Sequence, residues 1–255
     1  MKVRVLGCGG GIGGWSARTT ALLVDDDILI DAGTGLAELT LAELAAIDHV
    51  FLTHSHLDHI AALPLMIDAV ADLRRAPVVI HATPPTLRAV RGHIFNGDIW
   101  PDFSRIAIRE RLVMRCEAIR VGRRVALGHR AVAAVPARHT VPAVGYRLDS
   151  GQASLVFTGD TAENEAFWPA VNRIANLRYL IVETSFSDAQ EPLARASGHL
   201  CPRLLLAGLA RLAVPAQVYV AHMKPGQAEA IARELEAAPP DLRPTLLRDG
   251  QVFEF

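Results

Sequence analysis

The chain has 255 residues, of which 51% are hydrophobic and 21% are charged, so it can bury the core of one large globular domain. Its formal net charge of −1 excludes a global basic field of the kind that holds long nucleic acids. No apolar run reaches the length of a membrane span, and the N-terminal residues MKVRVLGCGGG lack the apolar core of a signal peptide.

The three cysteines, Cys8, Cys116 and Cys201, lie far apart and show no CxxC spacing. An odd number of distant cysteines argues against a disulfide framework and against a structural zinc knuckle. We therefore expect small buried residues in a reducing compartment, which together with the lack of an apolar leader predicts a cytoplasmic protein.

The first half of the chain is predicted to consist mainly of short strands with helices between them. Three aspartates at 25–27 separate two apolar runs and suit a hairpin turn. Thr40 and Glu43 match the capping box that begins a helix. The predicted strands cover residues 2–6, 21–24, 28–30, 50–53 and 78–81, and the predicted helices cover residues 40–46, 63–73 and 85–91.

In the second half of the chain, strands are predicted to alternate with helices. The predicted strands cover most of 105–119 and 124–134, then 146–148, 154–158, 179–183 and 217–221, with edge strands at 244–247 and 251–255. The predicted helices cover residues 166–174, 202–212 and 227–237. This order favours an α/β protein with two packed sheets and helices on the outside, formed by residues 1–255 as one domain.

A histidine-rich segment, THSHLDH at residues 53–59, follows the strand predicted at 50–53. His54 and His56 are two residues apart, so in an extended segment their side chains point the same way. Asp58 and His59 follow where the strand should turn into a helix, and that turn can aim them at a second, neighbouring metal. Imidazole and carboxylate are ligands of zinc, and also of manganese and iron. The segment predicts a metal centre rather than a solvated histidine-rich loop.

HSHLDH resembles the HxHxDH signature of the metallo-β-lactamase superfamily, and the later ligand motifs of that family follow in the expected order. The resemblance implies a four-layer αββα sandwich, in which two mixed β-sheets are flanked by helices. It also implies two divalent metal ions as cofactors, with zinc as the first expectation and manganese or iron as alternatives.

The resemblance assigns the metal ligands residue by residue. It implies that the first metal is held by His54, His56 and His139, which lies in ARHT. It implies that the second metal is held by Asp58, His59 and His222, which lies in VAHM, and that Asp160 in FTGDT bridges the two. Asp31 in ILIDAGTG matches a strand-end aspartate that supports the site without binding metal.

Such a centre implies hydrolysis. Two divalent ions about 3.5 Å apart lower the pKa of a shared water to near neutrality, and the resulting hydroxide is the nucleophile. The ions also polarise a phosphoryl or carbonyl oxygen and offset the charge that develops there. Asp58 is expected to orient or deprotonate the nucleophile while it binds metal. A positioned acid is still needed for the leaving group.

Gly9, Gly11 and Gly14 satisfy the GxGxxG pattern of dinucleotide-binding proteins, and Asp31 follows 17 residues after Gly14. A Rossmann unit also needs a helix directly after the glycines to receive the pyrophosphate, and residues 15–31 show no such helix. In the superfamily that the chain resembles, such a loop lies beside the metal site, so the resemblance implies that the glycines let substrate approach.

The segment GHIFNGDIWPDF at residues 92–103 resembles a stretch of the class II cyclic-nucleotide phosphodiesterases, and HSHLDHIAAL resembles their HxHLDH signature. Ala62 departs from that signature, which usually has glycine there. The resemblance makes Phe95 and Trp100 candidates for stacking on a base, and Asn96 a candidate for bonding to the base or ribose. The alternative is a surface loop packed by its own aromatic residues.

Three further residues are candidates for positions near the substrate. Glu183 in IVETS resembles a glutamate that supports a histidine in related phosphodiesterases, with a buried structural carboxylate as the alternative. His199 in SGHL resembles the histidine that faces the scissile phosphate in tRNase Z and in class II phosphodiesterases, as phosphate binder or general acid. Its alternative is an N-cap or surface histidine. Lys224 either contacts phosphate or is solvated.

The first functional hypothesis is hydrolysis of 3′,5′-cyclic AMP or GMP to the 5′-monophosphate, with a small-molecule substrate, no membrane or nucleic-acid partner, and a homodimer as the expected assembly. The second is a tRNase Z-like endonuclease for RNA 3′ ends, although no Gly- and Lys-rich arm for gripping tRNA is recognisable. The third is a lactonase or thioesterase of the same fold. A non-catalytic binding module would be expected to have lost ligands, whereas every ligand motif is present.

Overall fold

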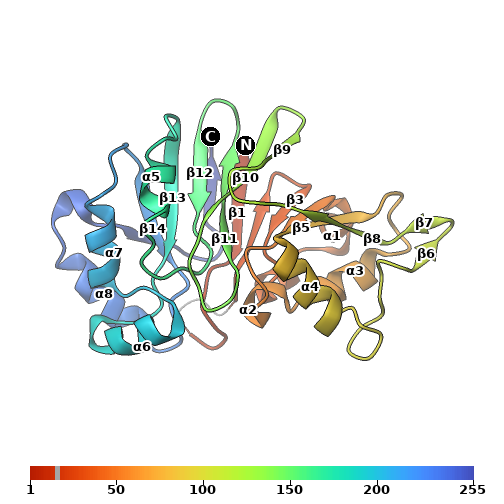
Figure 1. The fold of residues 1–255 in the computed structure, drawn as a ribbon, viewed down its shortest axis with the longest axis horizontal. Helices are drawn as coiled ribbons and strands as arrows, with labels where there is room; N and C mark the ends of the chain where they lie inside the picture. The colour runs from red at the N-terminus through yellow and green to blue at the C-terminus, as the bar shows by residue number, and fades with distance from the viewer. Residues whose placement is uncertain (15–17) are drawn as a thin grey trace.

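Two seven-stranded β-sheets pack face to face in the centre of the molecule, and helices cover the outer face of each sheet (Figure 1). This computed structural model describes residues 1–14 and 18–255. The arrangement is the predicted αββα sandwich. Within the described residues, no helix is long and apolar enough to cross a membrane.

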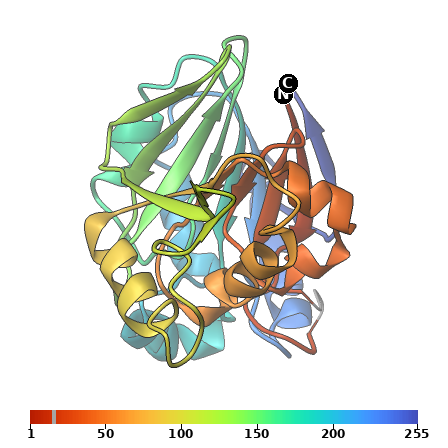
Figure 2. The same ribbon diagram turned by 90° about the vertical axis from the view of Figure 1, so that its right-hand side faces the viewer.

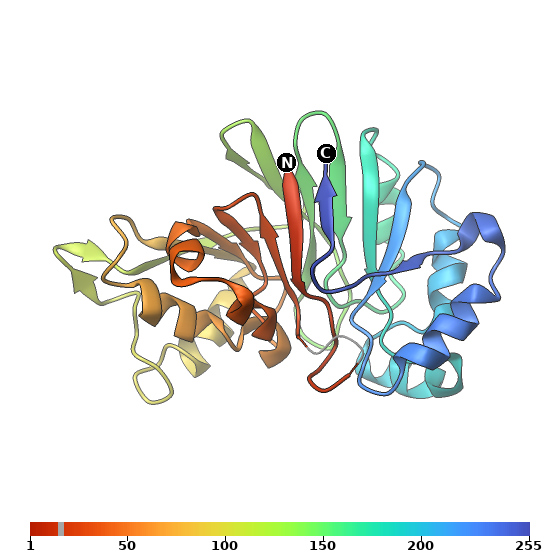
Figure 3. The same cartoon turned by 180° about the vertical axis from the view of Figure 1, so that it is seen from behind.

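The first sheet is built mainly from the N-terminal half of the chain. Its strands, in spatial order, are β16 (Val252–Glu254), β1 (Lys2–Gly7), β2 (Ala21–Val24), β3 (Ile28–Ile30), β4 (His49–Phe51), β5 (Val78–Ala82) and β8 (Met114–Ala118). Its outer face is covered by helices η1 (Thr34–Glu38), α1 (Leu41–Ala46), α2 (Leu57–Ile60), α3 (Leu63–Val70) and α4 (Pro84–His93), as Figure 2 shows from the side. The two chain ends lie together, because β1 pairs with β16 (Figure 3).

The second sheet is built from the C-terminal half. Its strands, in spatial order, are β15 (Thr245–Leu246), β14 (Gln217–Ala221), β13 (Leu177–Glu183), β12 (Ser154–Phe157), β11 (Val144–Asp149), β10 (Arg130–Pro136) and β9 (Arg124–Leu127). The remaining helices are α5 (Phe167–Val171), η2 (Asp188–Gln190), α6 (Glu191–Ser197), α7 (Pro202–Leu209), α8 (Ala228–Glu236) and η3 (Pro240–Leu242). Strands β6 (Ala107–Ile108) and β7 (Arg111–Leu112) form a small separate hairpin.

Strands β12 and β13 consist mainly of apolar residues because both of their faces are largely buried. In β12, Leu155 and Phe157 point into the core between the two sheets, whereas Val156 points into the core under the helices. β13 alternates in the same way, with Ile181 between the sheets and Leu180 on the other side. Side chains of a strand alternate between its faces, so a strand buried on both faces has a continuous apolar sequence.

The chemistry-bearing residues follow strands that end at one edge of the sandwich. β3, β4 and β5 are parallel in the first sheet, and β12, β13 and β14 are parallel in the second. The carboxyl ends of parallel strands meet at the same edge of their sheet. Helix α2, which carries part of the histidine-rich segment, marks this edge between the two sheets in Figure 1.

Two elements differ from the sequence prediction in ways that affect the site. The strand predicted at 50–53 ends at Phe51, because the backbone N–H of Thr53 donates to Asp31 instead of to a neighbouring strand. Helix α6 was not predicted, because it is short and shows no clear apolar periodicity. It ends at Gly198, whose φ of 72° is the left-handed conformation typical of a residue that follows a helix.

Candidate metal centre

The segment from His54 to His59 leaves the end of β4 in extended conformation and enters α2 directly. His56 is the N-cap of α2 and has extended backbone angles, and Asp58 and His59 lie in the first helical turn. The change from strand to helix therefore falls where the sequence predicted it. It separates the segment into two halves that face two different groups of neighbouring side chains.

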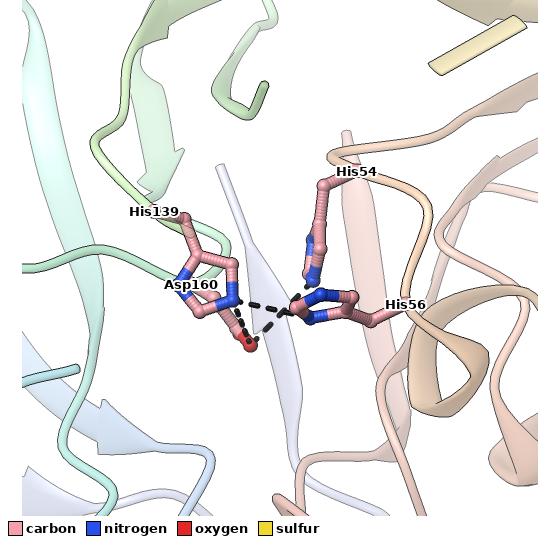
Figure 4. A group of neighbouring side chains, drawn as sticks. All are labelled: His54, His56, His139 and Asp160. Atoms are coloured by element: carbon pink, nitrogen blue, oxygen red, sulfur yellow. Dashed lines mark hydrogen bonds and ion pairs between the residues drawn. The ribbon is translucent and has the colours of Figure 1, made fainter. Parts of the chain in front are cut away.

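The first group combines the extended half of the segment with residues from the second sheet (Figure 4). His139 follows β10, and its Nε2 lies 3.2 Å from His56 Nδ1 and 3.8 Å from Asp160 Oδ2. His54 Nε2 lies 3.7 Å from the same carboxylate oxygen. One potential ligand atom from each residue lies within 4.8 Å of all the others, as a shared metal ion requires.

The second group combines the helical half of the segment with His222, which follows β14. Asp160 Oδ1 lies 3.2 Å from His59 Nε2, and Asp160 Oδ2 lies 3.0 Å from His222 Nε2. Asp58 Oδ2 lies 3.6 Å from His222 Nε2. Asp160 belongs to both groups, so it occupies the place of a bridging ligand between two neighbouring ions.

Three buried polar atoms at the centre of these groups have no hydrogen-bond partner among the described residues. They are His54 Nε2, His59 Nε2 and Asp160 Oδ1. A buried polar group without a partner is costly, and a metal ion bound between such atoms removes that cost. Five imidazoles and two carboxylates form a donor set that zinc, manganese and iron accept. The two His/Asp clusters therefore fit a dinuclear metal site.

The electrostatics of the centre keep most of its imidazoles neutral, which is the form that binds metal. Burial, with a further contribution from neighbouring imidazoles, lowers the pKa of His54 and of His56. Burial also lowers the pKa of His139, against the opposing effects of its bond to Gly198 and of the Asp160 carboxylate. Burial also acts to lower the pKa of His59, but the carboxylates of Asp160 and Asp31 outweigh it and raise that pKa well above its usual value. Burial acts to raise the pKa of Asp160, but the imidazoles of His222 and His59 lower it well below its usual range.

Buried acceptors behind the imidazoles hold the rings in place. Asp31, which follows β3, has Oδ2 at 2.7 Å from His59 Nδ1, and accepts hydrogen bonds from the N–H and hydroxyl groups of Thr53. His139 Nδ1 lies 2.8 Å from the carbonyl oxygen of Gly198. Such outer partners fix the tautomer and orientation of a metal-binding imidazole. Sequence reasoning singled out Asp31 but missed Thr53 and Gly198, because neither carries a ligand side chain.

Glu183 and His199 form a buried pair beside the two groups. His199 Nδ1 lies 2.8 Å from Glu183 Oε1, and Glu183 also accepts the backbone N–H groups of Thr161 and Leu200. The ring centroid of His199 lies 4.9 Å from that of His139 and 5.4 Å from that of His222. His199 is 5% exposed, and the N-cap of α7 is Cys201, so the alternative of a surface or N-cap histidine is wrong.

The aromatic segment after α4 does not join the metal centre. Phe95 is 1% exposed and packs against Phe103, so its ring is not free to stack on a base. Asn96 Oδ1 accepts the backbone N–H groups of Asp98 and Ile99, which folds the loop on itself. Trp100 packs against the core under the first sheet. For these three residues the structure favours the loop packed by its own aromatics over the substrate-binding hypothesis.

The glycine-rich loop packs against the turn that carries His222. A Cβ atom on Gly10 would lie 2.4 Å from the carbonyl oxygen of His222, and one on Gly11 would lie 2.9 Å from Pro225 Cδ. The backbone N–H of Gly10 donates to the carbonyl of Met223. A Cβ on Gly14 would lie 3.1 Å from Pro225 Cα, so Gly11 and Gly14 of the GxGxxG pattern both allow close packing against Pro225 without a nucleotide. Residues 15–17 of the segment in which no helix was predicted lie outside the described residues.

Comparisons with known proteins agree with this architecture. A probable 3′,5′-cyclic-nucleotide phosphodiesterase of Yersinia pestis is 25% identical over 183 residues, which cover 66% of this chain and 51% of that protein. A ribonuclease Z of Halorubrum lacusprofundi is 32% identical over 92 residues, which cover 34% of this chain and 30% of that protein. The chain thus spans about half or less of the length of these relatives. The crystal structure of unliganded yeast PDE1 superimposes with a TM-score of 0.81 at 18% identity, covering 98% of both chains, which shows a common fold.

A family model described as the Beta-lactamase superfamily domain matches residues 26–238, a range that runs from the turn before β3 to beyond α8 and includes every candidate ligand. With the αββα sandwich and the two His/Asp clusters, this match shows that the chain belongs to the β-lactamase superfamily and has the metallo-β-lactamase fold.

Proposed function

We propose that this chain is a metal-dependent phosphodiesterase that hydrolyses 3′,5′-cyclic nucleotides to 5′-monophosphates. The observation that carries the proposal is the Glu183–His199 pair, whose imidazole lies between the rings of His139 and His222. A lactone or thioester gives such a pair no obvious task. A phosphodiester carries a negative charge and releases an alkoxide. An imidazolium beside the two groups of candidate ligands can attract that charge and donate a proton to the alkoxide.

When bound, two divalent ions supply an activated water and offset the charge that develops on phosphorus oxygens. We propose zinc as the resident ion, with His54, His56, His139 and Asp160 around one ion and Asp58, His59, Asp160 and His222 around the other. We propose that Asp58, whose side chain is partly exposed at the start of α2, accepts a proton from the attacking water.

His199 is the proposed general acid. Burial acts to lower the pKa of His199, but the carboxylate of Glu183 outweighs it, so the pKa is raised and the protonated form is favoured. Its Nδ1 is occupied by Glu183, so Nε2 is the atom left for the substrate. As water oxygen bonds to phosphorus and the bond from phosphorus to O3′ breaks, the proton on Nε2 passes to O3′.

The ribonuclease Z relative supports a second candidate, an RNA-processing endonuclease with the same residues in the same roles. We favour a small phosphodiester, because the formal net charge of −1 gives no global attraction to a polyanion. We further propose a small cytoplasmic substrate, which needs no macromolecular partner. A homodimer is our expectation for the assembly.

The proposal is tested with protein reconstituted separately with zinc and with manganese. The substrates are 3′,5′-cyclic AMP, 3′,5′-cyclic GMP, bis(p-nitrophenyl) phosphate and a tRNA precursor, and the variants are His199→Ala and Asp58→Ala. His93→Ala, an exposed residue at the end of α4, is the matched control. We expect cleavage of a cyclic nucleotide that both site variants lose and the control keeps. Cleavage of the tRNA precursor alone would favour the second candidate, and cleavage of no phosphodiester would exclude both.

A further inference from the structure

Lys224 lies against the second group of candidate ligands rather than in solvent. Its Nζ is 3.5 Å from Asp58 Oδ2 and 3.3 Å from His222 Nε2. The side chain is 26% exposed, so the ammonium is partly withdrawn from water. Both partner atoms belong to residues of the second group and lie 3.6 Å from each other, and His222 Nε2 also lies 3.0 Å from Asp160 Oδ2. The sequence left open whether this residue is solvated, and its position on two ligand atoms was not foreseen.

A lysine is exceptional in this chain. Of the 26 lysines and arginines in the sequence, only Lys2 and Lys224 are lysines. The two side chains are not equivalent, because the ammonium is a compact point charge on a flexible stem whereas the guanidinium is a planar fork. A compact cation thus lies beside an imidazole nitrogen and a carboxylate oxygen that a divalent ion in the second group would also use.

The ammonium and a metal ion cannot use these atoms together. An ion bound by His222 Nε2 and Asp58 Oδ2 would lie about 2.0–2.2 Å from each of them. In the tautomer that carries its proton on Nδ1, which lies 3.5 Å from Thr20 Oγ1, His222 Nε2 has one lone pair. That lone pair either accepts a hydrogen bond from Lys224 or binds the ion. Two positive charges held around the same pair of atoms also repel each other strongly where water is largely excluded.

The backbone that carries Lys224 is held in place, so only its side chain can move. The N–H of Lys224 donates to the carbonyl of Ser185, and the N–H of His222 donates to the carbonyl of Cys8. The carbonyl of Met223 between them accepts from Gly10. Rotation about the side-chain bonds is then sufficient to withdraw the ammonium, without any rearrangement of the ligands.

We propose that Lys224 is a tethered cation that exchanges with the second metal ion. In the metal-free protein its ammonium occupies the lone pairs of Asp58 and His222, and the incoming ion must displace it. The exchange makes this the weaker of the two metal positions and sets the free metal concentration at which the dinuclear centre forms. The inference rests on the metal centre of the proposed function, but not on any particular substrate.

The first test measures the two stepwise dissociation constants for zinc by competition with a chromophoric chelator. Lys224→Met keeps an unbranched side chain that is one atom shorter and removes the charge, and Lys2→Met is the same change at the other lysine, which is exposed on β1. We expect the weaker zinc equivalent to bind at least tenfold more tightly in Lys224→Met, and both constants of Lys2→Met to match the wild type. An unchanged or weaker second constant in Lys224→Met would overturn the proposal.

The second test observes the ammonium itself in the full chain. Reductive methylation with ¹³C-formaldehyde keeps the charge and labels three amines, namely the N-terminus, Lys2 and Lys224, and the Lys224→Met variant assigns the third signal. We expect the Lys224 signal alone to shift, and to shift with the weaker zinc equivalent. A signal that stays constant through both equivalents, or follows the tighter one, would contradict the exchange. Neither test uses a substrate, so a failure of the phosphodiesterase proposal is recognised separately.

Discussion

The carboxylate of Asp31 lies 2.7 Å from Nδ1 of His59, 28 positions further along the chain, and joins the end of β3 to the first turn of α2. Asp31 is completely buried and has a φ of 57°, a conformation that is unusual for a residue with a side chain. Its other oxygen accepts the N–H of Thr53. One buried carboxylate therefore ends β4 early and orients a candidate ligand, so that the fold and the site depend on the same contacts.

Asp31→Asn is expected to weaken metal binding without removing a ligand. An amide cannot accept on its nitrogen side. Either the His59 ring and the Thr53 hydroxyl, which share Oδ2, or the backbone N–H of Thr53, which uses Oδ1, therefore loses its acceptor. Loss of such an outer partner typically lowers metal affinity by about 10- to 100-fold. The measurement is metal content after dialysis against graded chelator. Asp26→Asn, an exposed change in the turn between β2 and β3, should retain wild-type metal content, and equal losses in both variants would refute this role of Asp31.

Much of this site was predictable because its candidate ligands lie in short motifs that follow the ends of predicted strands. The spacing of the histidines and the aspartate in residues 53–59 was sufficient to predict a metal centre. His139, Asp160 and His222 were predicted from motifs that follow later strands in the order of a known family. The structure brings all of them into the two predicted groups. Short-range sequence pattern is a good guide here because the ligands outside α2 lie within a few residues of the end of a strand.

The errors concern residues whose side-chain direction depends on tertiary contacts. Nothing in the sequence around Phe95 distinguishes an aromatic ring that faces the core from one that faces a substrate, and it faces the core. Lys224 contacts the candidate ligands because it lies in a turn in which His222 has a φ of 64°. No local sequence pattern predicts that conformation. Contacts that depend on the backbone of a distant segment, such as Gly198 behind His139, have no sequence signature at all.

Gly10→Ala is expected to disturb the second metal group from outside it. The added Cβ would meet the carbonyl oxygen of His222 at 2.4 Å, and since that atom is backbone, the turn carrying His222 must shift. We expect a lower melting temperature and a weaker second metal equivalent. Gly92→Ala in α4 is the matched control, because a Cβ there meets nothing within 4 Å. That change should stabilise the protein by about 0.4–1 kcal/mol. A Gly10→Ala variant with wild-type stability and metal affinity would disprove the close approach.

The pair His49 and His81 predicts how stability depends on pH away from the metal centre. His81 is 2% exposed, stacks on Phe51 and lies 3.0 Å from a ring nitrogen of His49. Burial, and then the nearby charges of His49 and Arg115, lower the pKa of His81 to about 4. The folded protein therefore holds this imidazole neutral, whereas the unfolded chain protonates it near pH 6.5. This contribution to stability is fully present above pH 6.5 and is lost as the pH falls towards 4.

The expected loss across that range is about 3 kcal/mol, because one pKa unit corresponds to about 1.4 kcal/mol. Denaturant unfolding of chelator-treated protein between pH 7 and pH 4 measures it. His81→Phe keeps a ring against Phe51 and cannot be protonated, so its stability should fall less steeply with acid. The same change at the exposed His93 should leave the slope as in the wild type. Parallel slopes for wild type and His81→Phe would exclude His81 as the source.

The last prediction separates the roles of Glu183 and His199. If His199 delivers the proton to O3′, His199→Gln should lower kcat for a cyclic nucleotide by about 10²- to 10⁴-fold while the metal content stays at the wild-type level. Glu183→Gln keeps the imidazole but removes the charge that raises its pKa, so the alkaline limb of the pH–rate profile should move to lower pH. A substrate with a good leaving group, bis(p-nitrophenyl) phosphate, needs little help from an acid and should lose much less activity in both variants. Equal losses for both substrates would instead assign His199 to phosphate binding.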